Sequence, residues 1–402
     1  MAVSTRGTPR VAWLDGLRGF AAMQVVLLHY AYAFLPGLGF GNPQFIHFRW
    51  ELRLIDTPLD FLFSGVTAVY LFFIISGVVL TYAFSGRRLS IPSLIARRLI
   101  RLGLPMAATL ILAAILFRLL PGAPHAASRL LGISWFGVPL PSPVPFRTIA
   151  HQIFVEGLLT GYRDLDFLSH WLGAFIDLAP IQQARNPSLW TLHTEFVGSL
   201  LAMTLVATRA SAGRTVYRSI CVVLAFCFLA SPLCLFILGH LAAPHLQRAA
   251  GGTWRCVLAG LCLTLGVLLS TTPITSLPND PRLMFGAILV FAGVAQLPTV
   301  RRGLETPVLR WFGKISFSLY LTHFPVLFTV IAAAYTLEAA HVPYGASLAI
   351  GIVGGIAVSL AIATLFERWI DRPAIRLSHV SGQFFHRVVT PVVTIDAALP
   401  RP

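Results

Sequence analysis

Stretches of apolar residues, each about as long as a bilayer is thick, constrain the fold of this chain more than any other feature. They fall at about 17–35, 61–84, 102–120, 188–208, 219–243, 256–271, 283–297, 313–335 and 345–366. A helix needs roughly 20 mostly apolar residues to cross the hydrocarbon core. Only 11% of the 402 residues are charged, whereas a soluble domain carries about a quarter. The sequence therefore predicts an all-α fold, a polytopic transmembrane helical bundle, and excludes a soluble globular domain.

The net charge of +15 does not indicate a nucleic-acid partner. The arginines gather in short clusters between apolar stretches, for example at 87–101 and at 301–310. Cytoplasmic loops of membrane proteins hold such clusters, because positive charge is retained on that side during insertion. The pattern predicts a multi-pass protein of the plasma (inner) membrane, in which some arginines also meet an anionic ligand or anionic lipid heads.

The positions of the basic loops predict about ten crossings, although only nine stretches are visible. If both termini are cytoplasmic, the stretch 219–243 must begin and end on the cytoplasmic side. It contains Ser231-Pro232, a sequence that breaks helices, so we expect either two short crossings or a re-entrant hairpin there. We also expect an interfacial helix around 149–159 in the outer loop 121–187, and a disordered cytoplasmic tail at 377–402.

Three ionisable side chains fall inside apolar stretches, where their cost makes each a functional candidate. They are His29, Glu195 and His323. With a helix rise of about 1.5 Å per residue, they lie roughly 9, 10 and 15 Å along their helices from the nearer end. We expect them to meet in one layer. The alternative for a single histidine is a hydrogen bond that merely holds two helices together.

Arg18 precedes His29 by 11 residues, almost three helical turns. The two side chains therefore share one face of a helix, about 16 Å apart along its axis. A cationic entrance with an imidazole deep behind it suits a long ligand with an anionic head and a reactive tail, which is the shape of an acyl-coenzyme A. The alternative is that Arg18 only anchors the helix at the membrane surface.

Several short motifs occur in a recognisable order. They are Leu14-Asp15-Gly16-Leu17-Arg18-Gly19-Phe20 with His29, Phe72-Phe73-Ile74-Ile75-Ser76-Gly77, Arg97-Arg98 with Arg101 and Pro105, Leu189-Trp190-Thr191 with Glu195, Ser316 through Tyr320 to His323, and Phe366-Glu367 with Pro373. Over residues 11–376 this ordered set resembles the acyltransferase 3 family of integral-membrane acyltransferases. The resemblance implies a membrane acyltransferase domain at 1–376, which transfers an acyl group, most commonly acetyl, from acyl-coenzyme A to a hydroxyl of a cell-surface or exported sugar.

The resemblance also implies roles for individual residues. His29 would be the general base that activates the acceptor hydroxyl, or a relay that carries the acyl group. Glu195 would orient its imidazole. The phosphates of the donor would bind four guanidinium groups, those of Arg18, Arg97, Arg98 and Arg101.

The developing negative charge on the thioester oxygen needs hydrogen-bond donors. Tyr320, His323 or Ser76 are candidates, and Trp190 would support the site. Acyl-coenzyme A is then a co-substrate, and we expect neither a permanently bound cofactor nor a metal.

A different function class stays open at this point. A proton-coupled transporter or flippase of acyl or glycan-lipid material would use Glu195 and the histidines as a proton relay. Within the acyltransferase interpretation, the identity of the carbohydrate or glycolipid acceptor, the side from which it approaches, the acyl chain length and the oligomeric state are all undecided by the sequence.

Overall fold

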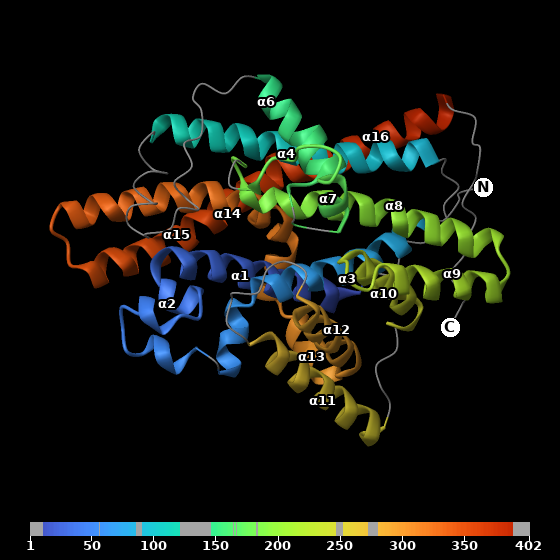
Figure 1. Ribbon diagram of the computed structural model, residues 1–402, viewed down its shortest axis with the longest axis horizontal. Helices are drawn as coiled ribbons and strands as arrows, with labels where there is room; N and C mark the ends of the chain where they lie inside the picture. The colour runs from blue at the N-terminus through green and yellow to red at the C-terminus, as the bar shows by residue number, and fades with distance from the viewer. Residues whose placement is uncertain are drawn as a thin grey trace.

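The computed structural model describes residues 11–388 except 56, 86–90, 121–145, 164, 166, 182–183, 247–251 and 272–279. Throughout these residues the secondary structure is helical and no strand occurs. The longer helices run side by side along the longest axis of the molecule, with α11 and α12 below them (Figure 1). This arrangement confirms the predicted all-α bundle.

Six helical segments are long and apolar enough to cross a membrane. They are α3 (Gly65–Phe84), α4 (Ile91–Leu119), the segment Pro187–Ser211 that contains α8 (Trp190–Ser211), α11 (Thr253–Ser270), most of α14 (Pro307–Ala339), and the continuous run Tyr344–Phe385 that begins with α15 (Tyr344–Phe366). A seventh crossing would be the pair α12 (Pro281–Gln296) and α13 (Pro298–Leu304), which is bent by 96°. The multi-pass character agrees with the sequence, whereas ten crossings and cytoplasmic termini stay predictions.

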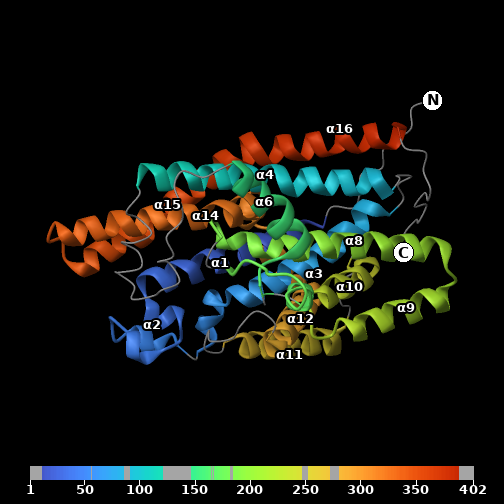
Figure 2. The same ribbon diagram turned by 45° about the horizontal axis from the view of Figure 1, so that its top comes forward.

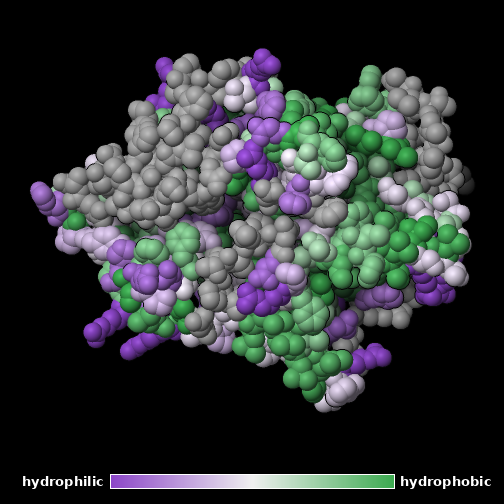
Figure 3. Space-filling model, viewed as in Figure 1, coloured by the Kyte–Doolittle hydropathy of each residue, from purple (hydrophilic) through white to green (hydrophobic). Residues whose placement is uncertain are grey.

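Apolar side chains are exposed along these helices, as contact with lipid requires. On α11, Leu258, Leu261 and Leu265 are each about half exposed, at 48%, 60% and 48%. Hydrophobic surface dominates the right and lower parts of the face in Figure 3, and hydrophilic residues gather toward the left. Helices that expose leucines all along one side are stable only against an apolar solvent.

The stretch 219–243 forms two short helices, α9 (Arg214–Cys227) and α10 (Leu233–Ala242). The break between them contains Ser231-Pro232, as predicted. The helix expected around 149–159 is also present, as α6 (Phe146–His151) followed by the π-helix η5 (Gln152–Thr160). Whether α9 and α10 cross the membrane, and whether α6 lies at its surface, stay predictions.

The tail predicted from residue 377 needs correction. Residues 377–388 continue helix α16 (Arg372–Val388), and residues 389–402 lie outside the described part of the chain. Helix α16 is ordered because it packs along α4, where the hydroxyl of Ser93 donates to the carbonyl of Gly382 at 2.5 Å. Figure 2 shows the two helices running together.

Helix α1 (Ala12–Phe34) packs against both α14 and α3. It approaches α14 very closely at Gly19, where an added Cβ would lie 2.5 Å from the carbonyl of Leu309 and from the amide of Gly313. Small residues allow such contacts between membrane helices. The same contact sets the distance between the side chains that α1 and α14 carry farther along, including His29 and His323.

A proline inside α14 joins two further elements to this pair. Pro325 has no N–H, so the carbonyl of Leu321, four residues earlier, loses its partner within the helix. That carbonyl instead accepts hydrogen bonds from the hydroxyl of Thr109 on α4 at 2.8 Å and from the amide of Asn186 at 2.7 Å. Helix α4 and the start of the α8 segment are thereby fixed beside His323.

Candidate functional site

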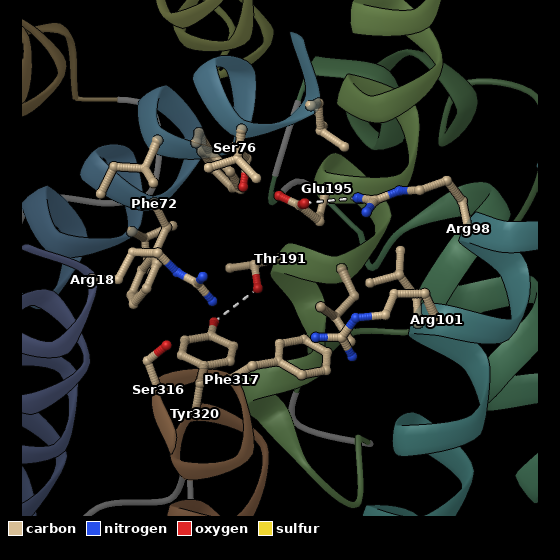
Figure 4. Close-up of a pocket in the computed structure, with 17 residues that line it drawn as sticks. Arg18, Phe72, Ser76, Arg98, Arg101, Thr191, Glu195, Ser316, Phe317 and Tyr320 are labelled. Carbon is tan, nitrogen blue, oxygen red and sulfur yellow. Dashed lines mark hydrogen bonds and ion pairs between the residues drawn. The ribbon is translucent and has the colours of Figure 1, made fainter. Parts of the chain in front are cut away.

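One pocket lies where α1, α3, α4, α8 and α14 converge. Its lining is mostly apolar, but it also contains several of the predicted site residues, among them Arg18, Ser76 and Glu195 (Figure 4). The residues that line it are Arg18, Val69, Phe72, Phe73, Ile75, Ser76, Val79, Leu80, Arg98, Arg101, Leu102, Thr191, Leu192, Glu195, Ser316, Phe317 and Tyr320. The pocket therefore combines an apolar wall with three guanidinium groups.

Two of these three arginines have acidic partners. Arg98 donates to the carboxylate of Glu195 at 2.8 Å. Arg101 donates to Asp371 and lies over the ring of Phe317, 4.5 Å from its centroid. Asp371 belongs to the π-helix η9 (Glu367–Asp371), and π-helical turns are frequent at functional sites.

The third arginine, Arg18, makes no hydrogen bond or ion pair with any residue of the described ranges. It extends from α1 toward the middle of the pocket, near Tyr320 (Figure 4). A partly buried guanidinium is costly unless a negative charge accompanies it. The pocket thus holds one positive charge that an anionic ligand group would balance.

Tyr320 closes one end of the pocket and is only 7% exposed. The hydroxyl of Thr191 donates to the hydroxyl oxygen of Tyr320 at 2.9 Å. A tyrosine hydroxyl has one hydrogen of its own to donate. Because Tyr320 accepts from Thr191, its own hydrogen is available to a ligand.

Behind Tyr320, the two predicted histidines form a pair. Nδ1 of His29 lies 2.9 Å from Nε2 of His323, and the ring of His323 lies 6.1 Å from that of Tyr320. His323 is fully buried, whereas His29 is partly exposed. Of the two imidazoles, His29 is therefore the one that a ligand can reach.

The hydrogen bonds of this pair determine where the protons lie. Nδ1 of His323 is 2.9 Å from the carbonyl oxygen of Leu319, and a carbonyl only accepts, so this nitrogen carries the proton. In a neutral ring the other nitrogen, Nε2, then accepts, and Nδ1 of His29 is its donor. Nε2 of His29 is left with a free lone pair. This is the tautomer that a general base requires.

The predicted hydrogen bond between Glu195 and His29 is absent. The carboxylate of Glu195 pairs with Arg98, and the ring partner of His29 is His323. Sequence distance along separate helices gave similar depths for Glu195 and His29 but could not show which way each side chain points.

The other predicted site residues divide into two groups. Ser76, Tyr320, Arg18, Arg98 and Arg101 line the pocket. Arg97 and Trp190 do not line it. Arg97 lies 2.5 Å from Nδ1 of His379 on α16, and Trp190 packs against the hydrophobic core. Within the described ranges no group of three His, Cys, Asp or Glu side chains gathers as a metal site.

Two residues of the site were missed as functional candidates in the sequence. Asp371 lies among basic residues at the end of the last apolar stretch. The one feature that could have indicated it is an acidic side chain within a basic cluster. Thr191 belongs to the Leu189-Trp190-Thr191 motif, which by itself indicates no role for it. Its hydrogen bond to Tyr320 supplies one.

The family model for acyltransferase 3, described as "Acyltransferase domain", matches residues 11–368. The chain belongs to the acyltransferase 3 family. It is accordingly an acyltransferase, and its apolar helices make it a multi-pass membrane protein. No significant match to the chain was found among the curated proteins or among the solved structures. The match includes all five pocket helices and the histidine pair, so the family domain and the site coincide.

We expect the variant Glu195→Gln of this acyltransferase to lose about 1 to 3 kcal/mol of stability, because Arg98 keeps its charge and loses its acidic partner. Thermal unfolding of the purified protein in detergent measures the loss. The double variant with Arg98→Gln should recover part of it, since the orphaned charge is then removed. Glu305→Gln, at an exposed position, is the matched control. Equal unfolding temperatures for Glu195→Gln and the wild type would contradict a stabilising ion pair between Arg98 and Glu195.

Proposed function

We propose that this acyltransferase transfers an acyl group, most commonly acetyl, from acyl-coenzyme A to a hydroxyl of a cell-surface or exported carbohydrate. The observation that carries the proposal is the combination of an unpaired guanidinium, Arg18, with an imidazole, His29, on one face of α1. The first suits the anionic part of the donor and the second suits the activation of an alcohol. The topology that fits best is about ten crossings of the plasma membrane with both termini cytoplasmic.

The donor would enter with its phosphates at the arginines. Arg18 makes no ion pair within 4 Å with a described residue, and guanidinium binds phosphate oxygens in a bidentate manner. Arg98 and Arg101 lie beside it but are already paired with Glu195 and Asp371. They would chiefly maintain the positive potential of the pocket. The apolar wall around Phe72 and Leu102 would accept the uncharged arm of the coenzyme.

The chemistry follows from the tautomer of the histidine pair. Nε2 of His29 takes the proton of the acceptor hydroxyl while the oxygen attacks the thioester carbonyl. A C–O bond forms and, as the tetrahedral intermediate collapses, the C–S bond breaks. The thiolate of coenzyme A then receives the proton from His29, so the base is regenerated. His323 fixes the orientation of His29 and shares the positive charge during the step.

Tyr320 is the best placed donor to the developing oxyanion. Its hydroxyl borders the donor pocket on one side and its ring lies near the histidine pair on the other. Such donors contribute most when they are held in position before the reaction. The hydrogen bond from Thr191 and the burial of the ring hold Tyr320 in this way.

Mass spectrometry of exported glycans tests this function in cells. We expect acyl esters on the glycan of cells that carry the gene, their loss on deletion, and their return with the wild-type gene but not with His29→Ala. Glycans with the same ester content in all four strains would overturn the proposal.

A further inference from the structure

A second pocket lies outside the donor site, beside the π-helix η5, which packs against α8. It is formed by α6, η5 and the residues that follow α7 (Phe167–Leu172). Figure 1 shows α6 beside α4, and the following η5 packs against α8. The residues that line the pocket are His151, Val155, Glu156, Thr160, Arg163, Ile176, Asp177, Leu178, Ala179 and Pro180. Nothing in the acyl-transfer step described above uses it.

The polar side chains of this pocket alternate between acceptors and donors. His151 lies 3.5 Å from the carboxylate of Glu156, and Arg163 donates to Asp177. The charges of Arg163 and Asp177 cancel, and the carboxylate of Glu156 adds a further acceptor, so the pocket does not suit an anion. A group that both donates and accepts hydrogen bonds fits it best, and a hydroxyl is such a group.

One acceptor in the pocket is buried without a partner. Glu156 is 8% exposed, and its Oε2 makes no hydrogen bond with any described residue. Burial raises the pKa of Glu156, while the nearby His151 opposes that shift. Buried carboxylate oxygens normally accept at least one hydrogen bond. Oε2 therefore has an unfilled place for a donor.

A ligand can easily break the ion pair between Arg163 and Asp177, which lies in the same pocket. Asp177 and Arg163 are 91% and 46% exposed, and an ion pair of this kind contributes little to stability. Beside it, the exposed rings of Trp171 and Phe175 lie 5.1 Å apart, and Phe175 directly precedes Ile176 of the lining. Exposed aromatic faces next to hydroxyl-binding groups suit the apolar face and the hydroxyl edge of a sugar ring.

We propose that this pocket is a distal subsite for the carbohydrate acceptor, in which sugar hydroxyls donate to Glu156 and Asp177 and accept from Arg163. The inference rests on the proposed function, because it takes the acceptor to be a glycan. Helix η5 is also tied to the donor site. The carbonyl of Leu158 bonds to His193 on α8 at 3.0 Å, and the flanking residues Thr191 and Glu195 line the donor pocket. A polymeric acceptor would span from this subsite to the reacting hydroxyl.

The test is calorimetric titration of the purified full chain with the exported glycan extracted from the cells that make it, without acyl-coenzyme A. We expect Glu156→Ala and Asp177→Ala each to weaken glycan binding at least about tenfold. Asp177→Ala guards against misfolding, because its side chain is exposed. Arg282→Ala, which removes the Asp280 ion pair on α12, is the matched control and should bind like the wild type.

A second measurement separates this inference from the proposed function. In acyl-transfer assays the two subsite variants should raise the KM for glycan about tenfold and change the KM for acetyl-coenzyme A less than about twofold. Transfer with an unchanged glycan KM would overturn the subsite and leave the function standing. Glycan binding that depends on Glu156, without any acyl transfer, would overturn the function and leave the subsite. Equal glycan binding by all variants, or none by the wild type, would overturn the subsite.

Discussion

We expect replacement of His29 with alanine to lower the rate of acyl transfer about 10³-fold, because in the proposed mechanism the acceptor hydroxyl would lose the base that takes its proton. The effect falls on kcat, since His29 does not line the donor pocket and the loss concerns a contact made in the transition state. The measurement is the steady-state rate of ester formation on the glycan by the purified protein, with acetyl-coenzyme A in excess.

His47→Ala is the matched control for this variant. His47 is exposed on the segment after α2 (Pro36–Gly39), away from the pocket, and its replacement should leave the rate within about twofold of the wild type. Size-exclusion chromatography checks that His29→Ala is folded. A well-folded His29→Ala protein with at least a tenth of the wild-type rate would remove His29 from the role of base.

We expect replacement of Arg18 with alanine to raise the KM for acyl-coenzyme A, the proposed donor, about 10- to 100-fold. A charge-assisted hydrogen bond contributes about 1.5 to 3 kcal/mol, and Arg18 is the pocket arginine that makes no ion pair with a described residue. If its contact with the phosphates is equally strong in the ground and transition states, kcat changes little.

Two further variants sharpen this second prediction. Arg18→Lys keeps the charge but loses the planar fork, so its KM should fall between those of the wild type and Arg18→Ala. Arg310→Ala removes an exposed arginine outside the pocket and should leave the KM unchanged. If Arg18→Ala also left the KM unchanged, Arg18 would be only an anchor at the membrane surface.

The sequence predicted the bundle well because membrane helices must satisfy their backbone within each helix. Apolar length locates the six helices that are long enough to span a membrane, whereas the predicted number of about ten crossings stays a prediction. The sequence also predicted the break at Ser231-Pro232, because a proline interrupts a helix through its own ring and its missing N–H. The helix α16 was missed because its order depends on packing against α4, through contacts such as Ser93 to Gly382, and no local pattern shows such a partner.

The sequence indicated most residues of the site, but it did not show which side chains contact one another. Arg18 and His29 share one helix, so their spacing fixed their relation. The pairs His29–His323, Arg98–Glu195 and Arg101–Asp371 each join two separate elements. Depth along a helix carries no information about rotation around its axis. For that reason the sequence predicts Glu195 beside His29, whereas in the structure it pairs with Arg98.

The most direct test of the central claim is the stoichiometry of one reaction in proteoliposomes of the purified protein, supplied with acetyl-coenzyme A and the exported glycan. The release of free coenzyme A thiol and the formation of acetyl ester on the glycan are measured together, for the wild type and for His29→Ala. We predict one thiol for each ester in the wild type, and neither product above background in the variant. Glycan or acyl movement across the bilayer without cleavage of the thioester would contradict the account and favour a transporter.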